Sequence, residues 1–268
     1  MAKAVESSGD DGSHDRVRAL LGEVRDSRAE DAGQPLEALA PLLESAASRL
    51  CLRKEGGIPF LVRLLPTQPA ATARLLQLCA ERRAQLEVHE AGGTTALLRA
   101  LRAAVPLSAT KKAVADVRSG EGDSILAEQL ALLTMTMRHP EVREAVRAVA
   151  GSEGAYERLV ALLDDGPLGT AGSLWNELHM STASLVTALA YGGRCKGLAA
   201  LAPQLSTALV TRLASSGSRV DVRVACATAI GNLSTTAAMR PQLVAAGPAP
   251  AGANVVKASA DSVLSRMP

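Results

Sequence analysis

Apolar residues in the segment Asp221–Leu233 recur at the spacing of one face of an α-helix. They stand at i, i+3, i+4, i+7, i+8 and i+11, namely Val222, Ala225, Cys226, Ala229, Ile230 and Leu233. A helical period of about 3.6 residues places all of them in one stripe. The segment is therefore predicted to be a helix, and its Ala-rich face lets a neighbouring helix approach closely.

A second kind of helix is predicted in Gly56–Leu65. Gly56 and Gly57 open this segment, and Pro59 follows near the first turn, where its missing N–H removes no hydrogen bond. A Leu/Val block begins at Leu61, and similar blocks begin at residues 97, 159 and 209, with a weaker copy at residue 17. From 17 onwards the starts of these blocks are separated by 44, 36, 62 and 50 residues.

Helices like the one predicted at Asp221–Leu233 also recur along the chain, one after each Leu/Val block from residue 61 onwards. When the other copies are aligned on Ala229–Leu233, the positions equivalent to Asn232 are Gln77, Thr134 and Tyr191. The one long interval has a visible cause, because residues 104–123 contain Pro106, Ser108, Gly120 and Gly122 and are predicted to be a loop insertion.

The two kinds of predicted helix resemble the second and third helices of an armadillo repeat, over about residues 17–247. Units of this kind are about 40–47 residues long. The resemblance implies an all-α protein, a right-handed α-solenoid of armadillo-like repeats with about four units and a partial fifth. An irregular all-α globule would show the same local features but not the regular spacing of the two helix series, so it remains the alternative.

Composition and segment boundaries agree with an all-α chain. Aromatic residues are only 1% of the 268 residues, which suits thin layers of Ala and Leu, and no alternating pattern predicts a strand. Residues 1–15 are predicted to be disordered and 16–247 to form the repeat domain. Residues 248–268 are predicted to be a linker and a poorly ordered or weakly helical tail. The repeat pattern stops after one helix of a fifth unit, so either a terminal face is left uncovered or the chain is a shortened form.

Charge and hydropathy exclude several partners. The formal net charge is only +2, which does not indicate a nucleic-acid-binding surface. No run of about 18 apolar residues predicts a membrane span, and no secretory signal is evident. These features favour a cytoplasmic protein, with the nucleus as another possible location.

Candidate chemistry is absent from the sequence. The four cysteines show no metal-ligand spacing, and Cys79 and Cys226 are predicted to be small core residues. No phosphate-binding loop, nucleophile elbow or zinc-protease motif occurs. We therefore expect no catalytic residues, no metal and no cofactor, and we expect that the protein is not an enzyme.

The armadillo resemblance implies a partner-binding groove along the third helices. Its candidate residues are Asn232, Thr228, Tyr191, Thr134 and Gln77. In that family an Asn at the place of Asn232 commonly binds the backbone of a peptide, since its amide both donates and accepts. Two alternatives stay open: Asn232 could bond a nearby carbonyl instead, and Tyr191 could be a packing residue near a helix C-terminus.

The predicted function is a non-catalytic protein–protein interaction scaffold that binds a partner segment along the groove. Two other roles fit the same pattern. One is a structural subunit of a larger cytoskeletal or ciliary assembly, associated through the C-terminal face. The other is a shortened targeting fragment of a larger multidomain protein.

Overall fold

The computed structural model describes residues 11–28, 31–105, 120–164, 173–193, 196–215 and 217–247. Within these ranges all regular structure is helical, without a β-strand, which confirms the all-α prediction. The chain divides into two compact units, Met1–Ala96 and Leu97–Pro268. Most of the predicted loop insertion and the whole predicted tail lie outside the described residues.

Unit 1 is a set of short helices that pack side by side. The second helix, α2, lies against both α1 and α5, and α4 lies against α5 and α6. Unit 1 contains α1 (Asp11–Asp26), α2 (Gly33–Leu39), the 3₁₀ helix η1 (Leu42–Glu44), α3 (Ala46–Lys54), α4 (Gly57–Leu64), α5 (Pro69–Leu78) and α6 (Arg82–Glu90).

One predicted boundary in unit 1 was wrong. Helix α1 begins at Asp11, so residues 11–15 are helical although they were expected to be disordered. The helix includes Gly12 and Ser13, which are poor helix formers, but Val17, Leu20 and Leu21 are buried and anchor it against its neighbours.

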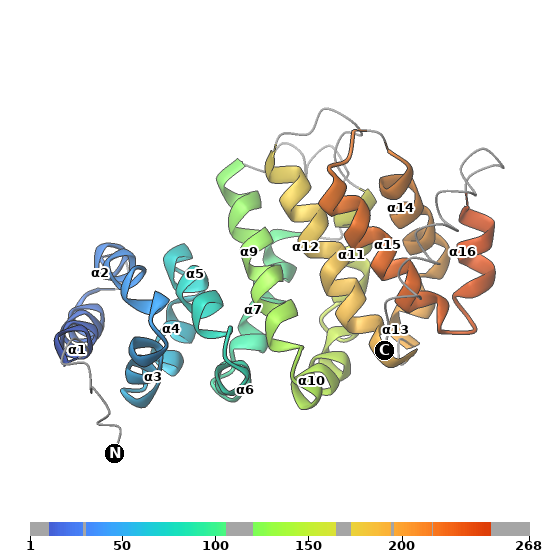
Figure 1. Ribbon diagram of the computed structural model, residues 1–268. Helices are drawn as coiled ribbons and strands as arrows, with labels where there is room; N and C mark the ends of the chain where they lie inside the picture. Colours follow the sequence, from blue (N-terminus) through green and yellow to red (C-terminus); the bar gives the residue numbers. More distant parts are fainter. Residues whose placement is uncertain are drawn as a thin grey trace, which may run out of the picture. The chain divides into compact units, whose positions relative to one another are not determined.

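Unit 2 consists of two layers (Figure 1). Helix α12 lies between α9 and α15 in one layer, and α14 lies between α11 and α16 in the other. The helix α7 (Gly93–Ala104) connects the two units. Unit 2 contains α9 (Gly120–Thr136), α10 (Pro140–Ala150), α11 (Ala155–Asp164), α12 (Ser173–Ala190), the 3₁₀ turn η2 (Tyr191–Gly193), α13 (Lys196–Ala199), α14 (Ala202–Ala214), α15 (Val220–Ser234) and α16 (Arg240–Ala246).

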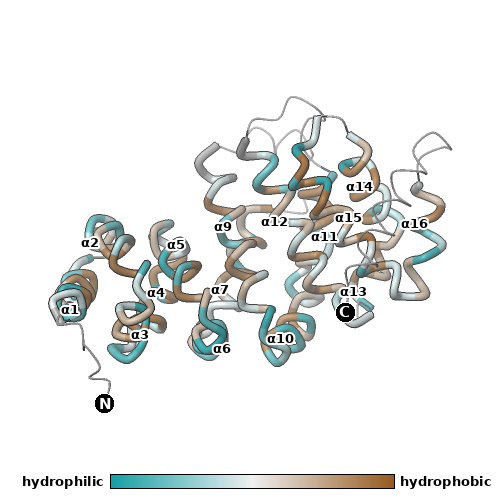
Figure 2. The backbone as a smooth tube through the Cα atoms, in the orientation of Figure 1, coloured by the Kyte–Doolittle hydropathy of each residue, from teal (hydrophilic) through white to brown (hydrophobic). Residues whose placement is uncertain are grey.

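Hydrophobic positions lie mainly where neighbouring helices of a unit face each other (Figure 2). On α15 the residues Val222, Cys226, Ala229 and Leu233 are all fully buried. Ala225 and Ile230 are only half-buried, which corrects the wider stripe predicted from the sequence. At about 100° per residue, these two positions lie about 70° to either side of the buried line, at the edges of the stripe.

The Gly-Gly pairs that precede α4 and α7 have a structural cause. The first glycine of each pair is left-handed, with φ of 72° at Gly56 and 85° at Gly92. The second glycine touches the preceding helix: a Cβ on Gly57 would lie 2.3 Å from Leu52 Cδ2, and one on Gly93 would lie 2.6 Å from Val88 Cγ1. A side chain at either second position would therefore force the two helices apart.

Candidate functional site

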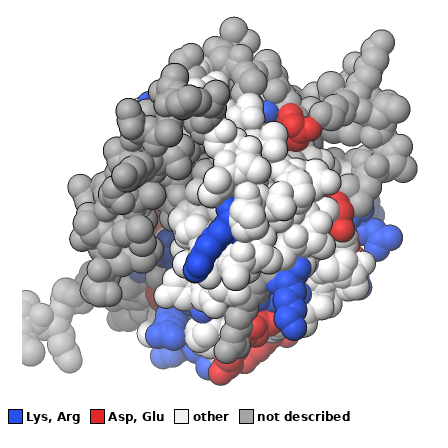
Figure 3. All heavy atoms as spheres, turned by 90° about the vertical axis from the view of Figure 1, so that its right-hand side faces the viewer, with Lys and Arg blue, Asp and Glu red and all other residues white. Residues whose placement is uncertain are grey.

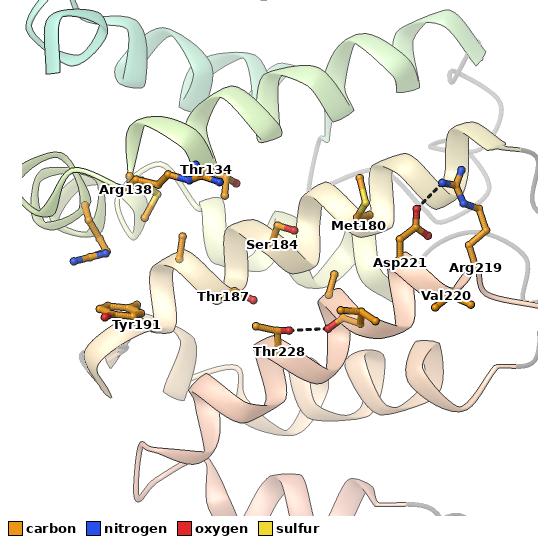
Figure 4. A pocket seen from close by; sticks show the side chains of 15 residues that line it. Thr134, Arg138, Met180, Ser184, Thr187, Tyr191, Arg219, Val220, Asp221 and Thr228 are labelled. Atoms are coloured by element: carbon orange, nitrogen blue, oxygen red, sulfur yellow. Dashed lines mark hydrogen bonds and ion pairs between the residues drawn. The ribbon is translucent and has the colours of Figure 1, made fainter. Parts of the chain in front are cut away.

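The exposed side of the α9–α12–α15 layer is hollowed (Figure 4). The hollow has a volume of about 1200 Å³, and we call it the α9–α12–α15 groove. Its lining comes from these three helices, from Arg143 of α10, and from the residues just after α9, just after α12 and just before α15. All of these residues belong to unit 2.

The floor of the groove is formed by one face of α12. Met180, Ser184, Thr187 and Tyr191 follow each other at steps of four, three and four residues, which is the spacing of one helical face. Tyr191 stands just beyond the end of α12, in the turn η2, and is 57% exposed. The floor thus combines a thioether, hydroxyl groups and an aromatic ring.

The walls of the groove are formed by α9 and α15. Thr228 donates a hydrogen bond to the carbonyl oxygen of Val224 at 2.8 Å, and Val224 itself is 58% exposed. On the opposite wall, Thr134 donates to the carbonyl oxygen of Leu130, also at 2.8 Å. Because both threonine hydroxyl protons are used within their own helices, each oxygen is left as an acceptor for a donor in the groove.

The two ends of the groove differ in charge. At one end Arg219 and Asp221 form an ion pair, and Asp221 also accepts a hydrogen bond from the backbone N–H of Val222 at 2.8 Å. At the other end lie Arg138, which is exposed, and Arg143, whose guanidinium carbon stands 4.6 Å from the centre of the Tyr191 ring. Neither of these two arginines has an ion-pair partner among the described residues.

The structure brings together three of the five predicted groove residues. Thr134, Tyr191 and Thr228 all line the groove, from three different helices or their ends. The placement of Tyr191 also agrees in part with the alternative, since it follows the C-terminus of α12 and its ring packs against Arg143.

The other two predicted residues are used inside the fold. Asn232 donates from Nδ2 to the carbonyl oxygen of Thr187 at 3.2 Å, which connects α15 to α12. Gln77, which belongs to unit 1, donates from Nε2 to the carbonyl oxygen of Ala40 at 3.3 Å. Neither residue lines the groove. Each amide connects its helix to a neighbouring helix or to its C-terminal cap, and for Asn232 this is the alternative that the sequence left open.

Several lining residues were missed by the sequence reasoning, and most carried a usable signal. Ser184 and Thr187 precede Tyr191 by two turns and one turn, Arg138 follows Thr134 by one turn, and Val224 precedes Thr228 by one turn. Stepping three or four residues along each predicted helix would have found them. Arg143 carried no such signal, because it reaches the groove from α10, a helix outside the α9–α12–α15 layer.

Reactive chemistry is weakly represented in the described part of the chain. Burial raises the pKa of the Cys79 and Cys226 thiols to about 12, so both are protonated at neutral pH and poor nucleophiles. Among the described residues no three His, Cys, Asp or Glu side chains gather as a metal site would require. Within the same residues, no helix has the length and apolarity needed to cross a bilayer.

Comparison with known proteins assigns no family. No protein-family model matches the chain, and no curated protein matches it significantly.

Proposed function

We propose that the protein is a non-catalytic interaction protein whose α9–α12–α15 groove binds a segment of a partner protein. In this proposal the two units belong to a right-handed α-solenoid of armadillo-like repeats. The observation that carries the proposal is the groove itself: it crosses three neighbouring helices and includes Thr134 and Tyr191, two positions that the repeat alignment makes equivalent.

The order of helices supports the repeat interpretation. The Leu/Val blocks that begin at residues 61, 97, 159 and 209 fall in α4, α7, α11 and α14. Each of these helices precedes a member of the second series, α5, α9, α12 and α15. In a repeat array, the corresponding helices of successive units stack on each other and form one continuous surface.

The dimensions of the groove indicate what fits. Along α12 the floor runs from Met180 to Tyr191, eleven residues that rise about 16 Å. An extended chain advances about 3.3 Å per residue, so about five residues of a partner cover that length. The lining offers apolar contacts at Met180 and Val224, and hydroxyl acceptors for the backbone N–H groups of an extended segment.

The test is a peptide selection on the purified protein, followed by binding measurements with two matched variants. Val224 and Val244 are both exposed valines, at 58% and 81%, but only Val224 lines the groove. Val224→Glu should abolish binding of the selected peptides, whereas Val244→Glu on α16 should leave it unchanged. If no binding peptide is selected, or if the two substitutions weaken binding equally, the proposal is refuted.

A second candidate function, a structural subunit of a larger assembly, is favoured by the end of unit 2. Uncharged side chains occupy most of the described surface on that face (Figure 3). The helix α16 buries none of its residues, and Val244 is 81% exposed. If this face is an interface, Val244→Glu should disrupt the protein's native complex in cell extracts while Val224→Glu leaves it intact.

A further inference from the structure

The α9–α12–α15 groove has an unbalanced charge, and this inference rests on the proposed function of that groove. Of its three lining arginines, Arg219 is neutralised by Asp221. Arg138 lies at the opposite end (Figure 4), where Arg143 stands over the ring of Tyr191, and neither has a carboxylate partner within the described ranges. Among the described residues, positive charge is therefore uncompensated at this end of the groove.

Arg143 differs from the arginine one turn further along α10. Arg147 donates from Nε to the carbonyl oxygen of Leu189 at 2.8 Å, donates to the carbonyl oxygen of Tyr191, and pairs with Glu144 at 2.7 Å. It is fully used in holding the end of α12. Arg143 has no such role: its Nε is enclosed yet has no acceptor in the described structure.

The ring of Tyr191 orients Arg143. Its guanidinium lies over the ring, 4.6 Å from the ring centre, in a cation–π contact. A guanidinium held by its face keeps its N–H edges free for a planar acceptor, and a carboxylate matches that fork of donors. Because the enclosed Nε is out of reach, a carboxylate in the groove would accept from the two Nη groups, which are not among the enclosed atoms of the described residues.

We propose that the groove selects an acidic partner segment, with an Asp or Glu side chain bound at the Arg138–Arg143 end. The adjoining residues of the segment lie along the floor of α12, where an apolar side chain contacts Met180 and Val224. The Arg219–Asp221 pair at the far end presents no net charge, so it does not compete for the acidic residue. The partner is thus a short segment with an acidic residue at one end and apolar residues toward the other.

A random peptide library displayed on phage provides the probe. Peptides selected on the wild-type protein should be enriched in Asp and Glu, with apolar residues a few positions away. The strongest of them is then synthesised, together with an analogue in which its acidic residues are replaced by Asn or Gln, and binding of both is measured by fluorescence polarisation.

Two double variants then locate the contact. Arg138→Gln with Arg143→Gln should weaken the acidic peptide about tenfold or more, without weakening the neutral analogue. Arg82→Gln with Arg99→Gln removes the same charge from exposed positions outside the groove and should have little effect. Affinity of the wild type should fall with added salt, and that dependence should be lost in the first variant.

The outcomes separate this inference from the proposed function. Peptides that lose binding with Val224→Glu but show no acidic enrichment would overturn the acidic anchor and leave the groove as a binding site. The same holds if the Arg138/Arg143 variant binds the acidic peptide as well as the wild type does. If no selected peptide is sensitive to Val224→Glu, the proposed function fails and the inference fails with it.

Discussion

The ion-pair network between α3 and α6 offers the sharpest test of what stabilises unit 1. Arg53 on α3 donates twice to the Glu87 carboxylate, at 2.9 and 2.8 Å, and once to Glu81 at 2.6 Å. The Arg53 side chain is 12% exposed and the two carboxylates are each 26% exposed. Replacing Arg53 by Met keeps most of the buried stem and removes all three hydrogen bonds.

The expected loss follows from these contacts. Removing one partner of a buried ion pair lowers the free energy of unfolding by about 3–5 kcal/mol, because the remaining charge is left unpaired. Here the cost is reduced, since Arg49 still pairs with Glu81 at 3.1 Å and Arg83 still pairs with Glu87 at 3.2 Å. Water also reaches about a quarter of each carboxylate and screens it. We therefore expect Arg53→Met to lower the free energy of unfolding of unit 1 by about 2 kcal/mol.

The pH dependence has a defined sign. Hydrogen bonds from Arg53 lower the pKa of Glu87 in the folded protein below its usual value of 4.5. A carboxyl with a lowered folded pKa stabilises the fold fully above the unfolded value, and this contribution is lost as the pH falls through the folded value. The difference between wild type and Arg53→Met should therefore be constant from about pH 7 to about pH 5 and should shrink below that.

Urea unfolding followed by circular dichroism, repeated across this pH range, measures both effects. Arg18→Met is the matched control, because Arg18 pairs with Glu55 on the surface, with side chains 56% and 37% exposed. It should change the free energy of unfolding much less. The reasoning is refuted if Arg53→Met unfolds at the same urea concentration as the wild type near neutral pH, or if its deficit persists unchanged in acid.

Three further predictions concern packing and thiol reactivity. Leu233→Ala, at a fully buried site on α15, should lower the free energy of unfolding in urea by about 2–5 kcal/mol. Ile230→Ala, at a half-buried site, should lower it clearly less. Equal losses would contradict the assigned helix face. Gly57→Ala should destabilise unit 1 by about 1–3 kcal/mol, because its Cβ would meet Leu52 and the backbone behind it; an unchanged thermal melt would show that the two helices can separate freely. Cys79 and Cys226, with pKa values raised to about 12, should resist iodoacetamide at about pH 8 in the native protein and react after unfolding in urea; mass mapping that finds either thiol alkylated in the native state would exclude its burial.

The sequence by itself determined the helices and their order. Apolar spacing, the Gly-Gly pairs and the Leu/Val blocks are local features, so they predicted helices at α4, α11, α14 and α15 without knowledge of the fold. Boundaries were less well determined. Helix α1 begins at Asp11 although its first turn is polar, because the burial of Val17 and Leu20 stabilises the whole helix.

Only the tertiary structure decided which side chains share the groove and which are used inside the fold. Asn232 and Gln77 look like binding residues in the sequence, but the amide nitrogen of each donates to a carbonyl of a neighbouring helix or of its C-terminal cap. Arg143 and Arg147 stand one turn apart on α10 and each follows a valine, yet Arg147 is bound to the end of α12 and Arg143 lies against Tyr191. The reason is physical: helical periodicity fixes the direction of a side chain about its own axis, whereas its hydrogen-bond partners depend on where the packing of other helices places their carbonyl groups.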